Sequence, residues 1–151
     1  MTDQLIVTLA SRSPKEIYIE LHQPGFINTL LETYGMSHCK PVGSPSTSPE
    51  SEISPDLDAN EHHRYRKLVG SLNYLAAATR PDIAYAVFQL SRKVASPTQS
   101  DWTAAKRVLR YLRGNQDLRL RYHHTGPLEA FSDADFANDP KDRKSITGGL
   151  L

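Results

Sequence analysis

The sequence predicts an α+β fold that is rich in helix and has short β elements near both ends. Three observations support this class: β-branched runs at the N-terminus, three apolar stripes with helical spacing between residues 61 and 113, and short alternating runs after residue 117. With 151 residues, 38% of them apolar, the chain is about one domain long and can form a core.

Membrane and secretory classes do not fit the composition. No apolar run approaches the roughly 18 residues that span a bilayer, and the N-terminal MTDQLIVTLASRS has an acidic residue where a secretory signal needs a basic start. The single cysteine, Cys39, excludes an internal disulfide and fits a reducing compartment. We therefore expect an intracellular protein, cytoplasmic or nuclear, with no membrane partner.

The first 60 residues predict a hairpin, a helix and a linker. LIVTLA (5–10) and IYIEL (17–21) flank a turn-like SRSPKE, which is typical of a β-hairpin. A helix that ends near Gly35 is predicted by apolar residues at helical spacing, namely Phe26, Ile27, Leu30, Leu31 and Tyr34. Residues 39–60 are rich in proline and serine, can bury little, and predict an extended linker.

Three helices are predicted after the linker. The first ends before Arg80, because the residue preceding a proline is disfavoured in a helix. It has a continuous apolar stripe of Tyr65, Leu68, Val69, Leu72, Leu75 and Ala76. The second buries Ile83, Val87, Leu90 and Val94. The third begins with a capping box formed by Thr98 and Asp101, and we expect Gly114 to end it in a left-handed conformation.

The middle of the chain is strongly basic. Residues 61–127 carry twelve basic and four acidic side chains, although the whole chain has a net charge of only +1. Lys106, Arg110 and Arg113 lie one helical turn apart with Arg107 beside them, and LRLRY (118–122) adds two further arginines, Arg119 and Arg121. Such a row can neutralise nucleic-acid phosphates. An ordinary solvated helix face remains the alternative.

FSDADF places two carboxylates, Asp133 and Asp135, on one face of a predicted strand. Two-metal nucleases hold Mg²⁺ with carboxylates on a rigid strand, but two carboxylates are too few for such a site. A strand followed by an Asp-rich turn remains the alternative. The histidine pairs at 62–63 and 123–124 have no complementary ligand set, so we expect solvated histidines. Cys39 has no evident base partner and is not expected to be a nucleophile.

Several segments resemble the polyprotein of copia-type LTR retrotransposons. They are YRKLVGSLNYLAAATRPDIAYAVFQLSR (65–92), AAKRVLRYLRGNQDLRLRY (104–122), FSDADFANDPKDRKSITG (131–148) and IYIELHQPGFINTLLETYGMSHCKPVGSP (17–45). Their order and spacing match the family over nearly all of residues 17–148. The matched stretch resembles the end of the reverse transcriptase joined to the start of its ribonuclease H domain.

The resemblance implies four parts. Residues 1–38 would be the end-of-palm hairpin and its helix, and 39–60 the linker. Residues 61–116 would form a three-helix unit like the thumb and connection of a reverse transcriptase. Residues 117–151 would be the truncated start of a ribonuclease H-like domain.

The resemblance also implies a role. Asp133 matches the first acidic residue of ribonuclease H, while the family's other acidic residues would lie beyond Leu151 and its polymerase aspartates upstream of the match. We therefore expect the chain alone to be non-catalytic and to hold no cofactor, with Mg²⁺ bound only in the complete parent enzyme.

The expected partners are an RNA–DNA or DNA template–primer duplex and the remainder of the polyprotein. The residues expected to bind nucleic acid are Lys106, Arg107, Arg110, Arg113, Arg119 and Arg121. A host-adopted protein-interaction module and a non-functional relic open reading frame are the alternatives.

Overall fold

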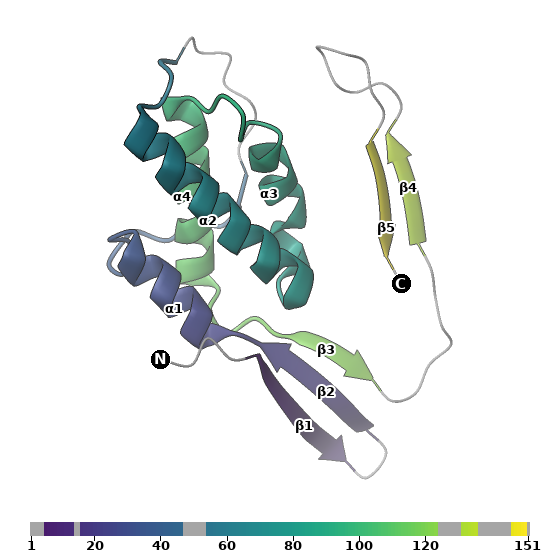
Figure 1. Ribbon diagram of the computed structural model, residues 1–151. Coiled ribbons are helices and arrows are strands. Elements are labelled where there is room, and N and C mark those ends of the chain that lie inside the picture. The colour runs from purple at the N-terminus through teal and green to yellow at the C-terminus, as the bar shows by residue number, and fades with distance from the viewer. Residues whose placement is uncertain (1–4, 14–15, 47–53, 124–130, 136–145, 151) are drawn as a thin grey trace.

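A computed structural model describes the backbone of residues 5–13, 16–46, 54–123, 131–135 and 146–150 (Figure 1). The elements in chain order are β1 (Ile6–Ser13), β2 (Glu16–His22), α1 (Pro24–Thr33), α2 (Ala59–Ala78), the 3₁₀ turn η1 (Pro81–Ile83), α3 (Ala84–Ser91), α4 (Gln99–Gly114), β3 (Leu120–His123), β4 (Phe131–Asp135) and β5 (Ile146–Leu150). The predicted α+β class is confirmed. None of the described helices is long and apolar enough to cross a bilayer.

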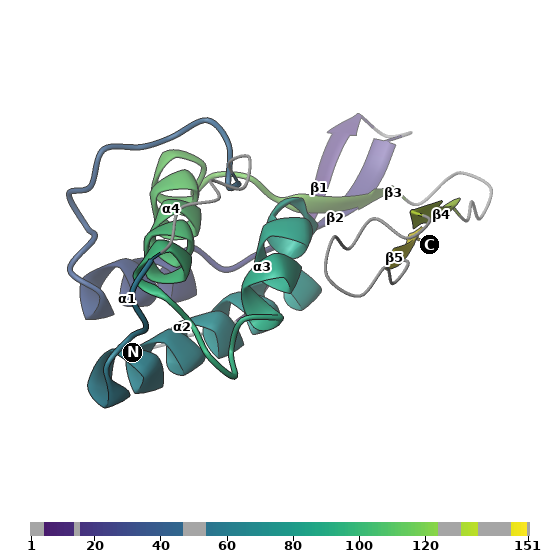
Figure 2. The same cartoon turned by 90° about the horizontal axis from the view of Figure 1, so that it is seen from above.

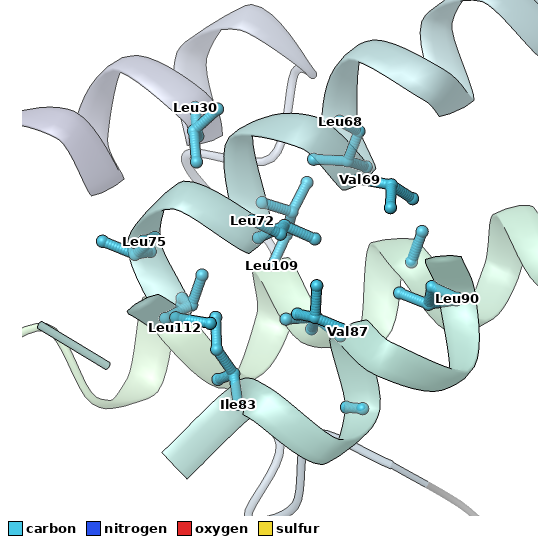
Figure 3. Packing of buried hydrophobic residues seen from close by; sticks show 14 of the residues in the cluster. Leu30, Leu68, Val69, Leu72, Leu75, Ile83, Val87, Leu90, Leu109 and Leu112 are labelled. Atoms are coloured by element: carbon cyan, nitrogen blue, oxygen red, sulfur yellow. The ribbon is translucent and has the colours of Figure 1, made fainter. Parts of the chain in front are cut away.

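The four α-helices share one apolar core, and we call α1 to α4 together the helical unit. Figure 3 shows Leu72 of α2, Val87 of α3 and Leu109 of α4 clustered together, and each of these side chains is fully buried. Burial of a side chain of this size contributes about 1.5–3 kcal/mol. The predicted buried face of the second helix is confirmed at Ile83, Val87 and Leu90, and the half-buried Val94 packs against the core beyond the end of α3.

The predicted caps are partly confirmed. The Thr98 backbone amide donates to Asp101 Oδ2 at 2.8 Å, which completes the capping box of α4. Gly35, with φ of +66°, follows α1 as expected. The prediction for Gly114 was wrong, because this residue is the last of α4 and Gly35 is the described glycine with positive φ. A Cβ at position 114 would lie 2.9 Å from Pro41 Cβ, so the glycine instead permits close packing of the linker.

The linker contacts α4 at both of its described ends. Near the start of α4, the Leu57 amide donates to Pro97 O at 3.0 Å, and the Ser100 amide donates to Ser54 Oγ at 2.9 Å. At the other end, the segment that follows α1 contacts the C-terminal half of α4 (Figure 2). The linker is therefore part of the helical unit, although it buries few large apolar side chains.

A polar cluster around the buried Arg80 joins η1 to the end of α4. Arg80, only 2% exposed, donates to the Asp82 carboxylate at 2.7 and 2.9 Å and to Asn115 O at 2.9 Å. Tyr111 Oη also donates to Asp82 at 2.9 Å. Burial alone would raise the pKa of Asp82, but the hydrogen bonds and charge of Arg80 outweigh it and lower the pKa. These contacts fix the turn between α2 and α3.

The first three strands form an antiparallel sheet in the order β1-β2-β3, and β4 pairs with β5 separately. The predicted hairpin is confirmed. The pairing of β3 with β2 was not anticipated, because the sequence analysis grouped LRLRY with the C-terminal strands. The four-part division of the chain stays a prediction.

The three-stranded sheet has two faces of opposite character. In the strand register, Val7 pairs with Leu21 and Leu21 with Leu120, while Ile19 lies between Leu9 and Tyr122. We call this side the apolar sheet face; it consists of Val7, Leu9, Ile17, Ile19, Leu21, Leu120 and Tyr122. The opposite side, the polar sheet face, includes Tyr18, Glu20 and Arg121.

Candidate nucleic-acid interface

The predicted basic row of α4 lies largely against the rest of the protein. Arg110 Nε donates to Lys40 O at 2.8 Å, and Arg113 Nε donates to Ser37 O at 2.9 Å. These two arginines therefore satisfy backbone carbonyls in the segment after α1. Each keeps its positive charge, but part of its hydrogen-bonding capacity is already used within the chain.

The other two cations of the row are half-buried. The Lys106 ammonium lies 5.8 Å from the centroid of the Trp102 ring, a distance that permits a cation–π contact. The Arg107 Nε atom is buried and has no hydrogen-bond partner among the described residues. The α4 row thus packs over the helical unit more closely than a solvated helix face would.

Arg119 and Arg121 lie on the polar sheet face and share one partner. Arg119 Nη1 is 2.8 Å and Arg121 Nη2 is 2.6 Å from the carboxylate of Glu20, a residue only 5% exposed. Hydrogen bonds from Arg121 and Arg119 lower the pKa of Glu20 below 4.5. The Arg121 guanidinium also lies 4.3 Å from the centroid of the Tyr18 ring. Glu20 therefore neutralises half of the charge that these two arginines supply.

A more open basic surface, which was not predicted from the sequence, lies on α2. Arg66 and Lys67 are both exposed, and neither pairs with another group in the described part of the chain. Gly70 and Tyr74 follow at one-turn intervals, so all four residues lie on one side of the helix. We call this set the α2 outer face. Its sequence signal was a pair of cations followed one turn later by a glycine, opposite the apolar stripe.

Gly70 and Tyr74 give this face an unusual shape. A Cβ at Gly70 would meet no atom within 4 Å, so no described contact requires a glycine there. A mid-helix glycine nevertheless costs about 1 kcal/mol relative to alanine. The Tyr74 side chain is 51% exposed, and its hydroxyl accepts a hydrogen bond from Gln23 Nε2 at 3.2 Å. The face therefore combines two cations, an open backbone position and an anchored aromatic ring.

The structure adds little to the predicted metal chemistry. The described residues contain no group of three or more potential metal ligands. Asp133 lies on β4 with its backbone opposite Gly148, and its side chain and that of Asp135 lie outside the described part.

The prediction that His62 is solvated was wrong. Its Nε2 atom lies 2.8 Å from Val94 O in a partly buried contact.

One surface pocket of about 160 Å³ lies between α1 and the end of α4. It is lined by Asn28, Leu31, Glu32, Ser37, Arg113 and Gln116. The single acidic and single basic side chain leave its lining without net charge. It therefore gives no electrostatic preference for an anionic ligand.

Comparisons with known proteins show which polyproteins the chain resembles. The chain is 42% identical over 145 residues to the retrovirus-related Pol polyprotein from transposon RE2 of Arabidopsis thaliana, covering 94% of this chain and 10% of that polyprotein. It is 37% identical to the corresponding polyprotein from transposon TNT 1-94 of Nicotiana tabacum, and the match covers 87% of this chain and 10% of that polyprotein. An uncharacterised mitochondrial protein of Arabidopsis thaliana, AtMg00810, is 35% identical over 85% of this chain and 54% of its own length.

No family model and no solved structure matches the chain. The chain spans about a tenth of the length of the transposon polyproteins that it matches. The resemblance inferred from the separate motifs is confirmed, because the identity extends over most of the chain. The chain is therefore similar, over nearly all of its length, to the retrovirus-related Pol polyproteins of transposons, as the copia-type motifs predicted.

Proposed function

We propose that the chain is a nucleic-acid-binding part of the reverse transcriptase and ribonuclease H region of a copia-type Pol polyprotein. Its ligand is an RNA–DNA or DNA template–primer duplex, and the chain is not catalytic alone. The observation that carries this proposal is the α2 outer face, where the exposed Arg66 and Lys67 have no partner in the described structure and Gly70 lies one turn away.

Each feature of the α2 outer face suits a duplex backbone. Arg66 and Lys67 can neutralise phosphates and release counterions, which gives affinity without sequence preference. Gly70 leaves room for a sugar–phosphate strand to approach the helix backbone. Tyr74 presents an amphipathic ring at the end of the same stripe, where it can pack against a sugar or a base edge.

The α4 row has a secondary role in this proposal. Arg110 and Arg113 hold the segment after α1 and add to the positive field around the helices. Replacing either by alanine removes a structural hydrogen bond as well as a charge. Substitution by lysine keeps the charge, so it tests their electrostatic part with less damage to the fold.

The alternative of a protein-interaction module loses its main candidate surface. A partner protein would be indicated if the helix face of Ile83, Val87, Leu90 and Val94 were open; the first three residues are at most 5% exposed, and Val94 is half-buried against the core. The charged surfaces of the helical unit remain. This burial favours nucleic acid over a partner helix as the ligand of the helical unit.

The first test measures binding of a labelled RNA–DNA duplex by fluorescence anisotropy at several salt concentrations. Each lost phosphate contact lowers the slope of log K against log salt by about 0.9, so the Arg66→Ala/Lys67→Ala variant should lose about two units of slope. Lys93→Ala, an exposed cation beyond α3, is the matched control and should lose less. An unchanged slope in the double variant refutes the α2 outer face as the binding surface.

The second test separates binding from stability at Gly70. Gly70→Ala should stabilise the helix by about 0.5–1 kcal/mol, because alanine has the higher helix propensity. The same change should weaken duplex binding, because the added methyl group lies where the strand approaches. Gly43→Ala, at another open glycine in the linker, should leave affinity unchanged. A more stable Gly70→Ala variant with undiminished affinity contradicts the proposed close approach.

The third test concerns catalysis. We expect the purified chain to show neither primer extension nor RNA cleavage with Mg²⁺, and Asp133→Asn should leave this result unchanged. Robust Mg²⁺-dependent activity that the Asp133→Asn change abolishes would overturn the non-catalytic assignment. Asp133 would bind metal only in a complete ribonuclease H domain that supplies further carboxylates.

A further inference from the structure

The apolar sheet face has the composition of a core but is not covered by the described chain. Val7 is 61% exposed, Leu9 73% and Tyr122 51%, and Ile17 and Ile19 are each more than 40% exposed. Figure 1 shows the sheet extending away from the helices rather than lying across them. Contiguous apolar patches of this kind are rare on soluble monomers and mark interaction surfaces.

The two faces of the sheet differ in how much apolar surface they expose, although Ile6 on the polar sheet face is also 41% exposed. On the polar sheet face, Glu20 is buried beneath Arg119 and Arg121, and Arg121 lies over Tyr18. On the apolar sheet face, alternating aliphatic residues from three strands have no such cover. Antiparallel sheets that face water on one side normally turn their apolar side toward a core.

We propose that the apolar sheet face docks against another folded segment of the same Pol polyprotein, one that presents an apolar surface of its own. This inference rests on the similarity to transposon Pol polyproteins and specifies the surface for the polyprotein partner of the proposed function. The polyproteins that the chain matches are about ten times its length, so most of their polypeptide lies outside the matched region.

Effective concentration favours this occupant over a second copy of the chain. In the polyproteins that the chain matches, a segment joined to the matched region by a short flexible connection would have an effective concentration in the millimolar range. A free second copy would have to reach a similar concentration to compete. The sheet is also separate from the helical core, so docking does not require the helices to rearrange.

The test uses the intact chain and two probes. The probes are purified fragments of the transposon RE2 polyprotein, one from each side of its matched 145 residues. Calorimetry should show binding of one fragment, and Leu9→Lys should weaken that binding at least tenfold by placing an ammonium group in an apolar interface. The matched control is Thr8→Lys, which carries the same charge on the adjacent residue of β1 but on the opposite face.

Folding is checked in both variants by helical circular dichroism, since neither position contributes to the helical core. Binding of neither fragment by the wild-type chain overturns the proposal. Equal loss in Leu9→Lys and Thr8→Lys also overturns it, because the two faces would then not differ. The wild-type chain could instead form a concentration-dependent dimer that Leu9→Lys abolishes, and bind neither fragment. That result would identify a second copy of the chain as the occupant and overturn the proposed polyprotein partner.

The duplex-binding measurement distinguishes this inference from the proposed function. Leu9→Lys should leave the salt dependence of duplex binding unchanged, because Leu9 is not on the α2 outer face. Fragment docking without duplex binding would overturn the proposed function alone. Duplex binding without fragment docking would overturn this inference alone.

Discussion

The helical unit and the three-stranded sheet differ in how completely they bury their apolar residues. Leu72, Leu109 and Leu112 of the helical unit are fully buried, whereas Leu9 of the sheet is 73% exposed. The helices bury their apolar stripes against one another, so their remaining candidate surfaces are charged, apart from the exposed aromatic rings of Tyr74, Tyr85 and Phe88. The sheet leaves one apolar face open, so its candidate surface is apolar. The same chain therefore offers two surfaces suited to different kinds of partner.

The largest expected difference between the two regions is in the cost of removing a leucine side chain. Leu72→Ala should destabilise the protein by about 3–4 kcal/mol, because it leaves a cavity in a closed core. Leu9→Ala should change stability by less than about 0.5 kcal/mol, because the side chain is already exposed. Urea unfolding followed by helical circular dichroism measures both values. Equal losses would mean that the sheet face is buried in solution.

The polar cluster of the helical unit gives the next effect. Arg80→Met should lower the free energy of unfolding by about 3 kcal/mol, because it leaves Asn115 O without its donor and removes the ion pair of Asp82, which keeps only its hydrogen bond from Tyr111. Arg64→Met on α2 is the control; its guanidinium is exposed and lies over the Trp102 ring at 5.8 Å, a contact worth about 1 kcal/mol or less. Thermal unfolding of both variants checks the difference, and a cost for Arg80→Met no larger than the control's would show that the cluster does not fix the turn.

A smaller effect tests whether the linker is part of the helical unit. Gly114→Ala places a Cβ 2.9 Å from Pro41 Cβ, so one of the two segments must shift. We expect a net loss of about 1 kcal/mol, as overpacking outweighs the better helix propensity of alanine. Chemical denaturation measures the change. A stabilised Gly114→Ala variant would indicate that residues near Pro41 move away freely.

The smallest effect is expected at the polar sheet face and depends on pH. Glu20 has a pKa below 4.5 in the folded chain, so its ion pairs stabilise the fold above pH 4.5. This contribution is lost as the pH falls through the lower folded-state pKa. A carboxyl NMR titration should give a Glu20 midpoint below 4.5, and Arg121→Gln should raise it. A midpoint at or above 4.5 in the unaltered chain would mean that the pairs do not form.

The sequence predicted most of the local structure correctly. The α4 capping box depends on Thr98 and Asp101, which are three residues apart, and the helical stripes repeat every three or four residues. Gly114 was misinterpreted because a glycine at a helix end usually takes positive φ, whereas here Pro41 requires it. The family was also predicted, from motifs that lie contiguously in the chain.

The candidate sites were predicted less well, because their partners are distant in the sequence. Arg113 donates to a carbonyl 76 residues away, and Arg121 pairs with a carboxylate 101 residues away. A basic row in the sequence shows charge but not which charges are already paired. Likewise, the solvent exposure of Arg66 and Lys67 can be known only from the positions of the neighbouring elements.

The sequence by itself determined the helices, the hairpin, the capping box of α4 and the resemblance to transposon polyproteins, because these depend on residue spacing within a few turns or on contiguous motifs. Only the tertiary structure decided that β3 joins the hairpin, that Glu20 pairs with two predicted phosphate-binding arginines, and that Arg66 and Lys67 of α2 have no partner in the described chain. The physical reason is that strand pairing and ion pairing act between residues brought together by folding, and short-range periodicity carries no record of those distances.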